Sequence, residues 1–465
     1  MNKAIIAANG AKPSVRQLLW QETEFYGLIS YGLPVFTGKQ YGGGFTPPAV
    51  FWPEDMDTDS WCEIAKDAGM KGLLLTCKHY DGFCLWPTKY TDYSVASSAW
   101  MDGQGDLVRL TAQSCKKYGL KFGIYLAPWD RHEKSYGQGE KYDDFFCGLL
   151  EELLTGYGEI FCVWLDGVVG ADEKRTQNYN WGRYYSVIRS LMPNAVIAFM
   201  GPDVRWCGNE TGMMRDEEWS PQPAYLGVTE TGDSPAFSGK KKLDLRSAKL
   251  GDRKSIEGQT YFIWYPCELS MPMRKHWFFD EEDKYNLKTK DKLLKYYFGS
   301  VGNNSCFMLG LSPNKRGVLE DNDTQILRSF GKEIALLFGS NVVDASTLIS
   351  ASSEEKEHAA SSLKMKSGGY WRPESEDKKP WIEFRFQEEM LFDKIVLSEN
   401  ICNGQHIEEF EIFTEDHKMK LRRVYTGKTV GYKRICCIPP AKTKRVRIVF
   451  YSYRSFFELS GIQIN

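Results

Sequence analysis

Short apolar runs rich in β-branched or aromatic residues recur along the first 340 residues, and stretches with helical spacing of apolar positions separate them. The runs predict strands at Gly27–Tyr31, Lys71–Thr76, Lys121–Leu126, Phe161–Leu165, Val196–Met200, Tyr261–Tyr265 and Cys306–Leu311, and a further strand near Gly212–Trp219. The helical stretches are Asp59–Ala68, Gly105–Tyr118, Asp143–Leu154, Trp181–Leu191 and Lys290–Ser300. Alternating strands and helices indicate a parallel sheet, and about eight repeats in roughly 300 residues favour a (β/α)₈-type barrel.

The pattern changes after about residue 340. Trp381–Phe386, Lys394–Ser398, Glu408–Thr414 and Arg445–Tyr451 alternate or run apolar, and no helical pattern of useful length lies between them. This pattern is typical of an all-β sandwich. We therefore expect a catalytic barrel domain at residues 1–340 and a β-sandwich domain at 341–465. The Gly-, Lys- and Ser-rich segment 221–258 predicts a long loop over the barrel mouth.

Composition narrows the class of protein. The chain has 465 residues, 42% hydrophobic and 26% charged, which is ordinary for a soluble globular protein of two or three domains. Its formal net charge of −2 provides no positive field for nucleic acid, which is not expected as a partner. No apolar run approaches the roughly 18 residues of a membrane span. Aromatic residues reach 14%, which fits either a large core or a surface for sugar stacking.

The cysteines, the histidines and the N-terminal segment limit other expectations. The twelve cysteines contain no C-x-x-C pair, and four in apolar stretches predict buried free thiols: Cys62, Cys77, Cys162 and Cys306. The neighbours Cys436 and Cys437 should face opposite sides of a strand. None of the six histidines is spaced as a ligand pair on one helix, so no metal is expected. The N-terminal segment is not a convincing signal peptide, which leaves the compartment open between cytoplasmic and exported locations.

Two carboxylates follow predicted barrel strands, where barrel enzymes place their chemistry. Asp166 follows an apolar strand and precedes Gly-Val-Val-Gly, although a turn-capping aspartate would look the same. Glu210 lies in a polar, Gly-flanked loop one unit later, where a solvated glutamate is the plain alternative. Glycosidic cleavage needs two carboxylates flanking the bond, and adjacent strand ends can bring such groups to about 5–6 Å. The pair therefore indicates a glycoside hydrolase.

Several aromatic and imidazole side chains also lie near predicted strand ends. His79 after the second strand is more often a polar anchor than a catalyst. The tryptophans near polar strand ends fit either a core or a sugar-lined pocket, and they are Trp86, Trp129, Trp206 and Trp277. Their placement favours the pocket, so an oligosaccharide or glycoconjugate is the expected partner.

Five sequence blocks occur in a specific order: CKHYDGFCLWPTKYTDYSV (77–95), KFGIYLAPWDRH (121–132), VWLDG (163–167), GPDVRWCGNETG (201–212) and SVGNNSCFMLGLSPNKRGVL (300–319). Together they resemble the α-L-fucosidases of glycoside hydrolase family 29, in the branch that acts on α-1,3/1,4-linked fucosides. The resemblance covers most of residues 15–340. It implies an exo-acting, retaining enzyme without a cofactor, with Asp166 as nucleophile and Glu210 as acid/base. It also implies that His79, Arg215 and Trp277 contact the sugar.

Three positions depart from the family pattern. The family's first strand ends in I-H-F-G, whereas this chain has Ile29-Ser30-Tyr31-Gly32. The loop 42–53 resembles one that presents a fucose-binding glutamate, and Thr46 stands in that place. The second histidine of KHHDGF is Tyr80. These changes predict an altered sugar pocket, for L-galactose, L-glucose or another L-sugar. A non-catalytic glycan-binding protein is the other alternative, against which the two retained carboxylates argue.

The C-terminal part carries a second likeness. PWIEFRF (380–386) and ENICNGQHIEEFEIF (399–413) resemble discoidin-like sandwiches, which are often carbohydrate-binding modules. The alternative is a sandwich that only braces the barrel.

Overall fold

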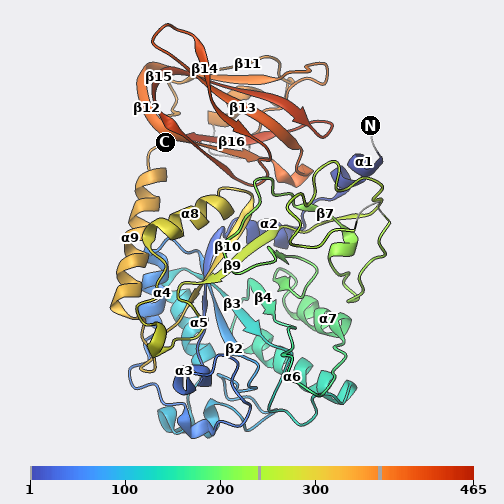
Figure 1. The fold of residues 1–465 in the computed structure, drawn as a ribbon, viewed down its shortest axis with the longest axis vertical. Coiled ribbons are helices and arrows are strands. Elements are labelled where there is room, and N and C mark those ends of the chain that lie inside the picture. The colour runs from blue at the N-terminus through green and yellow to red at the C-terminus, as the bar shows by residue number, and fades with distance from the viewer. Residues whose placement is uncertain (1–2, 239–241, 365–368) are drawn as a thin grey trace.

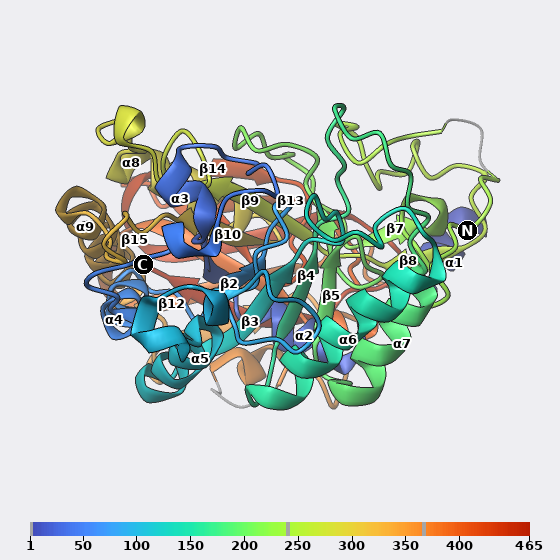
Figure 2. The ribbon, with the colours of Figure 1, turned by 90° about the horizontal axis from the view of Figure 1, so that it is seen from below.

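The computed structural model describes residues 3–238, 242–364 and 369–465. Eight parallel strands form a nearly closed barrel in the order β5-β4-β3-β2-β1-β10-β9-β6, and a bridge between Ala198 and Val204 links its two edges. The strands are β1 (Phe25–Ile29), β2 (Gly72–Lys78), β3 (Lys121–Leu126), β4 (Cys162–Leu165), β5 (Val196–Phe199), β6 (Arg205–Trp206), β9 (Cys267–Pro272) and β10 (Ser305–Leu311). Figure 2 shows β2, β3, β4 and β5 with α5, α6 and α7 along their outer side.

Amphipathic helices cover the outside of the barrel (Figure 1). They are α4 (Thr58–Asp67), α5 (Leu107–Tyr118), α6 (Glu140–Gly156), α7 (Trp181–Leu191), α8 (Lys290–Ser300) and α9 (Asp321–Phe338). Asp57 accepts a hydrogen bond from the Ser60 N–H and so caps the N-terminus of α4. The shorter helices are α1 (Lys3–Gly10), α2 (Val15–Gln21), α3 (Leu33–Thr37) and the 3₁₀ turns Pro48–Val50, Val95–Ser97, Trp100–Gly103, Ala224–Leu226, Glu281–Asp283, Ala360–Lys364 and Ile401–Asn403.

Two predicted barrel strands are wrong. Tyr261–Tyr265 corresponds to β8 (Phe262–Trp264), which pairs antiparallel with β7 (Pro221–Pro223) outside the barrel. The barrel strand is β9, which contains Glu268 and ends at Pro272, so its sequence lacks the continuous apolar character of the others. The sixth strand is the two-residue β6 rather than Gly212–Trp219, and two residues are too few to produce a recognisable period.

The barrel strands are buried along their length, which explains their nearly continuous apolar sequences. The predicted thiols Cys62, Cys77, Cys162 and Cys306 are free and buried in this core or against it. Within the described ranges, no helix has both the length and the apolar character needed to cross a membrane.

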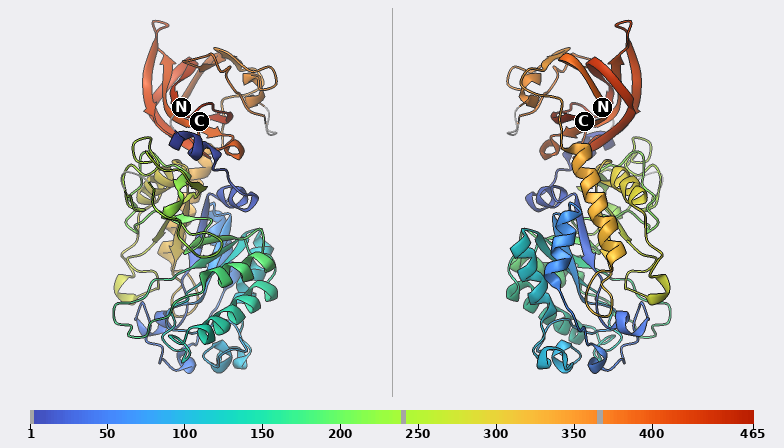
Figure 3. Two further views of the ribbon diagram at one scale, coloured as in Figure 1. Left: turned by 90° about the vertical axis from the view of Figure 1, so that its right-hand side faces the viewer. Right: turned by 90° about the vertical axis from the view of Figure 1, so that its left-hand side faces the viewer.

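Six antiparallel strands form the C-terminal domain, with β12 central to the order β11-β12-β15-β13-β14 and also paired with β16. The strands are β11 (Leu348–Ala351), β12 (Trp381–Glu399), β13 (Ile407–Glu415), β14 (Leu421–Gly427), β15 (Arg434–Tyr453) and β16 (Leu459–Ile464). The predicted runs Trp381–Phe386 and Lys394–Ser398 are two halves of β12, whose pairing with β15 shifts register between them. Figure 3 shows the sheet curling around its own core, above the barrel. Cys436 is buried and Cys437 exposed, as predicted for neighbours on a strand.

Candidate active site

A cavity of about 550 Å³ opens at the carboxyl ends of the barrel strands. Six of the nine residues predicted to act on or bind a sugar line it: Asp166, Glu210, Ser30, His79, Tyr80 and Trp277. The other described residues lining it are Leu28, Gln40, Tyr41, Thr76, Tyr125, Trp164, Val168, Phe199, Trp206, Arg246, Pro272, Lys275, His276, Phe278 and Met308. The predicted long loop 221–258 therefore contributes Arg246 to the cavity wall.

Asp166 is the first residue after β4, and hydrogen bonds from neighbouring strand ends fix it. Its Oδ2 accepts hydrogen bonds from the hydroxyls of Tyr80 and Tyr125, each at 2.5 Å. Its Oδ1 accepts the Val168 N–H at 3.2 Å. Burial raises the pKa of Asp166, and the three hydrogen bonds oppose that shift because they stabilise the carboxylate. The arrangement presents an oriented carboxylate at the cavity floor.

An aromatic stack forms the rest of the floor. The Trp164 ring lies between Tyr125 and Phe199, with centroid distances of 5.3 Å and 4.5 Å and interplanar angles of 14° and 10°. The Trp164 Nε1–H donates to the buried Glu268 at 2.9 Å, which fixes the ring orientation. Burial raises the pKa of Glu268 to about 7. Phe199 adopts a left-handed φ of 65°, a strained backbone that the surrounding packing must hold.

Glu210 is held far more loosely than Asp166. It is exposed on the loop after β6, and its Oε1 accepts a hydrogen bond from Trp277 Nε1–H at 3.2 Å. Partial burial raises the pKa of Glu210, the Trp277 bond opposes this, and the charge of Asp166 raises the pKa further. Because that charge reaches Glu210 across the cavity, the two carboxylates form one electrostatic site. A raised pKa is what a proton donor requires.

His79 presents a neutral imidazole to the cavity. Burial, together with the neighbouring charge of Lys78, lowers the pKa of His79 to about 3. Lys78 itself is fully buried and paired with Asp130 at 3.0 Å. Among the described residues, His79 Nδ1 has no hydrogen-bond partner. The ring packs against Tyr80 and Phe278, which sets its position at the cavity wall.

Gln40 and Tyr41 bring the loop after α3 to the cavity, and the sequence analysis missed both. The Gln40 amide donates to the Phe278 carbonyl at 3.1 Å and accepts the Phe278 N–H at 3.0 Å. The Tyr41 ring stacks on the Tyr80 ring with a centroid distance of 6.0 Å and an interplanar angle of 25°. This loop therefore contributes an amide and an aromatic ring.

Thr46 of the same loop, which is predicted to contact the sugar, does not line the cavity. Gly42 and Gly44 adopt left-handed φ values of 60° and 78°, and they turn the chain away after Tyr41. Thr46 lies beyond this turn with its backbone near the Tyr93 hydroxyl.

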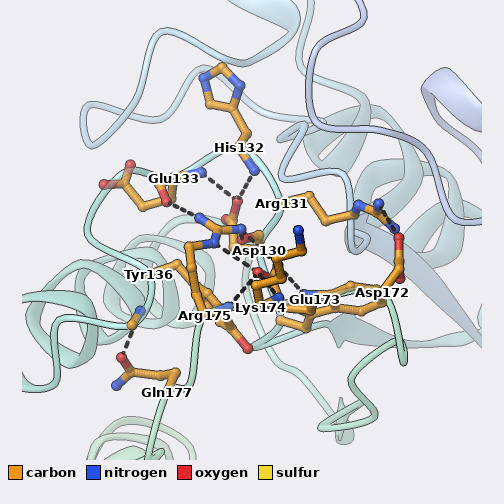
Figure 4. Close-up of polar contacts among 12 residues, drawn as sticks. Asp130, Arg131, His132, Glu133, Tyr136, Asp172, Glu173, Lys174, Arg175 and Gln177 are labelled. Carbon is orange, nitrogen blue, oxygen red and sulfur yellow. Dashed lines mark hydrogen bonds and ion pairs between the residues drawn. The ribbon is translucent and has the colours of Figure 1, made fainter.

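Trp129 is also placed behind the cavity wall rather than on it. It is 1% exposed, and its Nε1–H donates to Glu173 at 3.0 Å. Its ring packs against that of Tyr80 with a centroid distance of 4.8 Å. Arg175 then joins the loops after β3 and β4, since it binds Glu173 and donates to the Asp130 carbonyl at 2.9 Å (Figure 4). Trp129 thus supports Tyr80, and this network supports the loop that follows Asp166.

Arg215 does not reach the cavity either. Its Nε–H donates to the Ser247 carbonyl at 2.8 Å, and its Nη1 group donates to Glu218 Oε2 at 3.1 Å. These contacts join the Glu210 loop to segment 221–258. Arg215 lines a second hollow, which shares Arg246 with the main cavity, so its contact with the substrate stays a prediction.

Tyr125 is the most important residue that the sequence analysis missed. It pairs in register with Thr76 on β2 and Trp164 on β4, and all three side chains line the cavity. A signal existed, because alternation along the predicted strand Lys121–Leu126 places Tyr125 on the same face as its inward-facing neighbours.

Among the described residues, no cluster of three or more His, Cys, Asp or Glu side chains forms a metal site. The side chains that line the cavity include two carboxylates in unlike surroundings, three phenols and two imidazoles.

Known proteins resemble this chain in sequence and in fold. The family profile described as Alpha-L-fucosidase matches residues 20–335. Alpha-L-fucosidase 1 of Arabidopsis thaliana is 36% identical over 434 residues, which cover 91% of this chain and 81% of that protein. A Bacteroides ovatus crystal structure, provisionally named an α-L-fucosidase, matches with a TM-score of 0.87 and 34% identity over 99% of this chain and 75% of its own. A Ruminococcus gnavus GH29 fucosidase in complex with fucose matches with a TM-score of 0.85 and 25% identity over 98% and 94%.

Proposed function

Because the chain belongs to the α-L-fucosidase family of glycoside hydrolases, we propose that Asp166 and Glu210 release fucose by a retaining double displacement. Membership of the family makes the chain a fucose-releasing glycoside hydrolase; the residue roles and the stereochemical course are the proposal. One observation carries it: two carboxylates line one cavity in unlike surroundings. Asp166 is oriented by three hydrogen bonds, whereas Glu210 lies in a loop with a raised pKa.

In the first step, an Asp166 carboxylate oxygen bonds to the anomeric carbon as the bond to the glycosidic oxygen breaks. Protonated Glu210 gives its proton to that oxygen, so the aglycone leaves as a neutral alcohol. In the second step, ionised Glu210 takes a proton from water, and the hydroxide attacks the same carbon and displaces Asp166. Two inversions at one carbon give net retention.

The neighbouring groups fit these roles. The phenols of Tyr80 and Tyr125 stabilise ionised Asp166 before attack and hold it for in-line approach. The neutral imidazole of His79 lines the cavity and is placed to form a hydrogen bond with a sugar hydroxyl. The Trp277 ring at the cavity wall offers an apolar surface to the C–H face of the sugar.

We propose further that the sugar pocket departs from the family pattern, since Ser30 and Tyr80 stand where that pattern has histidines. Ser30 is short and lines the cavity, which leaves room beside the ring hydroxyls. The loop after α3 brings Gln40 to the cavity and leaves Thr46 outside it. A neutral amide therefore stands at the cavity, whereas the family pattern has a glutamate on this loop. This change favours a second candidate function: hydrolysis of another α-L-glycoside, such as L-galactoside or L-glucoside. A panel of aryl α-L-glycosides distinguishes the two candidates by kcat/KM.

The proposed preference for branched α-1,3/1,4-linked fucosides is supported by a second hollow of about 380 Å³, lined by Gly208, Asn209, Met213 and Arg246 among others. Arg246 lines both this hollow and the main cavity, so the two adjoin beside Glu210. A branched aglycone would extend in this direction. Faster release from α-1,3/1,4-linked than from α-1,2-linked fucosyl oligosaccharides is the expected result, and the reverse order would contradict it.

The stereochemical course is tested by proton NMR during turnover of an aryl α-L-fucoside. We expect α-L-fucose to form first and the β anomer to grow only by mutarotation. If β-L-fucose forms first, the enzyme inverts, and Asp166 is not a covalent nucleophile.

A further inference from the structure

The loop that carries Glu210 has few anchors of its own. It leaves β6 at Cys207, whose N–H donates to the Glu268 carbonyl at 2.9 Å. The Asn209 side chain then accepts the N–H groups of Thr211 and Met213, each at 3.1 Å, which shapes a local turn. Beyond the weak bond from Trp277, Glu210 is placed by the course of this loop. The position at which the loop returns to the barrel therefore matters.

The C-terminal domain holds the returning end. Gln405, 1% exposed and in the segment before β13, donates from its amide to the Glu218 carbonyl at 2.9 Å and accepts the Ser220 N–H at 2.8 Å. The Thr429 hydroxyl oxygen accepts the Glu218 N–H at 3.2 Å. The sandwich thus pairs with three backbone polar groups of Glu218 and Ser220, and Asn304 immediately before β10 adds a second donor, at 3.0 Å, to the Glu218 carbonyl.

Arg434 of β15 continues this contact toward Glu210. Its Nη1 group donates to the Asp216 carbonyl at 2.9 Å and also to Asn303. Asn303 in turn donates to the Arg215 carbonyl. The chain is therefore held at residues 215, 216, 218 and 220, beginning five residues after Glu210.

The two ends of the loop are joined through a buried charge. Glu218 accepts hydrogen bonds from Arg205 of β6 and from Arg215, which links the end of the loop to its beginning. Glu218 is fully buried, so a displacement of its backbone would disturb this pairing. Any shift of the sandwich contact is thereby passed to the segment that contains Glu210.

We infer that the sandwich positions the acid/base, and that Gln405, Thr429 and Arg434 are its positioning residues. The inference rests on the proposed role of Glu210. It is specific to one half of the mechanism, because the hydrogen bonds to the Asp166 side chain within the described residues all come from the barrel. Loss of the sandwich contact should therefore impair proton donation and leave nucleophilic attack intact.

The test is kcat/KM across aryl α-L-fucosides whose leaving groups range from good to poor. Good leaving groups need little protonation, so impaired proton donation shows as a steeper dependence on the leaving group. Gln405→Ala should lose about tenfold more activity on the poorest leaving group than on the best, within the roughly 10²–10⁴-fold worth of a general acid. Arg434→Ala should show the same steepening, and it provides the test if Gln405→Ala does not fold.

Two reference variants make the outcome decisive. Arg253→Ala removes an ion pair to Glu408 at 2.7 Å, a contact between the same domains on a different loop, and should leave the leaving-group dependence unchanged. Glu210→Ala should show the full steepening; a flat result there would overturn the role of Glu210 itself. If Glu210→Ala steepens the dependence while folded Gln405→Ala and Arg434→Ala lose activity equally on all substrates, the sandwich is only a structural brace and the inference fails.

Discussion

The two carboxylates of the cavity sit in regions built in opposite ways. Asp166 ends a buried strand, and hydroxyls from two adjacent strand ends hold it at 2.5 Å. Glu210 lies on an exposed loop, with a hydrogen bond of 3.2 Å from Trp277 and distant support through residues 215–220. The first region is fixed by the barrel itself, and the second by the packing of a separate domain against a loop.

This difference matches the demands of the two roles. A nucleophile must stay ionised and in line with the bond that it attacks, so rigid placement among hydrogen-bond donors serves it. A residue that alternates between acid and base must change its protonation state twice in each cycle, so access to water serves it. Rigid strands and adaptable loops divide these tasks in many barrel enzymes.

The largest expected effect comes from breaking the fixed side of the comparison. Asp166→Asn keeps the shape of the side chain but removes the attacking charge, and it should lower kcat/KM by roughly 10⁴-fold or more on every fucoside. Steady-state kinetics on aryl and natural substrates measure this, with circular dichroism to confirm folding. Residual activity within tenfold of the unmodified enzyme would remove Asp166 from the mechanism.

A smaller effect should follow from removing one of the hydrogen bonds that hold Asp166. Tyr125→Phe deletes a hydrogen bond that lowers the pKa of Asp166, so the pKa should rise. Because Asp166 acts ionised, the acidic limb of the kcat/KM profile should move to higher pH, and the loss should be greatest at low pH. A hydrogen bond to a charged group is worth about 1.5–3 kcal/mol, or roughly tenfold or more in rate.

A matched control exists for Tyr125→Phe. Tyr184→Phe also removes a buried phenol that donates to a carboxylate, that of Asp143, but neither residue lines the cavity. It should lower stability and leave the acidic limb in place. Equal displacement of the limb in both variants would show that the shift does not report on Asp166.

The smallest effect should come from removing the hydrogen bond that Trp277 donates to Glu210. Trp277→Phe removes the hydrogen bond that lowers the pKa of Glu210, so that pKa should rise. Because Glu210 acts protonated in the first step, the basic limb of kcat/KM should move to higher pH. The exposed bond is screened by water, so only a few-fold loss in rate is expected. Trp206 also lines the cavity but does not bond to Glu210, so Trp206→Phe should leave the basic limb in place. If Trp277→Phe shifts the acidic limb instead, the assignment of the basic limb to Glu210 is contradicted.

The sequence predicted most of the barrel because buried parallel strands have long apolar runs, as in Lys121–Leu126. It failed at β9, where Glu268 and Pro272 interrupt the run although the strand is fully buried. It singled out Asp166 and Glu210 from specific motifs after strands, and both line the cavity. It could not place Thr46 or Arg215, since Gly42 and Gly44 redirect one loop and the partners of the other residue come from distant segments.

The interdomain contacts show the same limit. Gln405 and Thr429 lie about 200 residues from the backbone groups that they bind, and no local pattern marks them. Side chains that act through tertiary contacts carry no period or motif, so only the folded arrangement reveals them.

The most direct test of the account is azide rescue of Asp166→Gly. The deleted side chain leaves space beside the anomeric carbon, and azide can attack there while Glu210 still protonates the leaving group. With an activated aryl α-L-fucoside, we predict that azide restores turnover and that the product is β-L-fucosyl azide, because a single displacement inverts the anomeric carbon. Failure of azide to restore turnover in the folded variant, or formation of the α-azide, would contradict the assignment of Asp166 as the nucleophile.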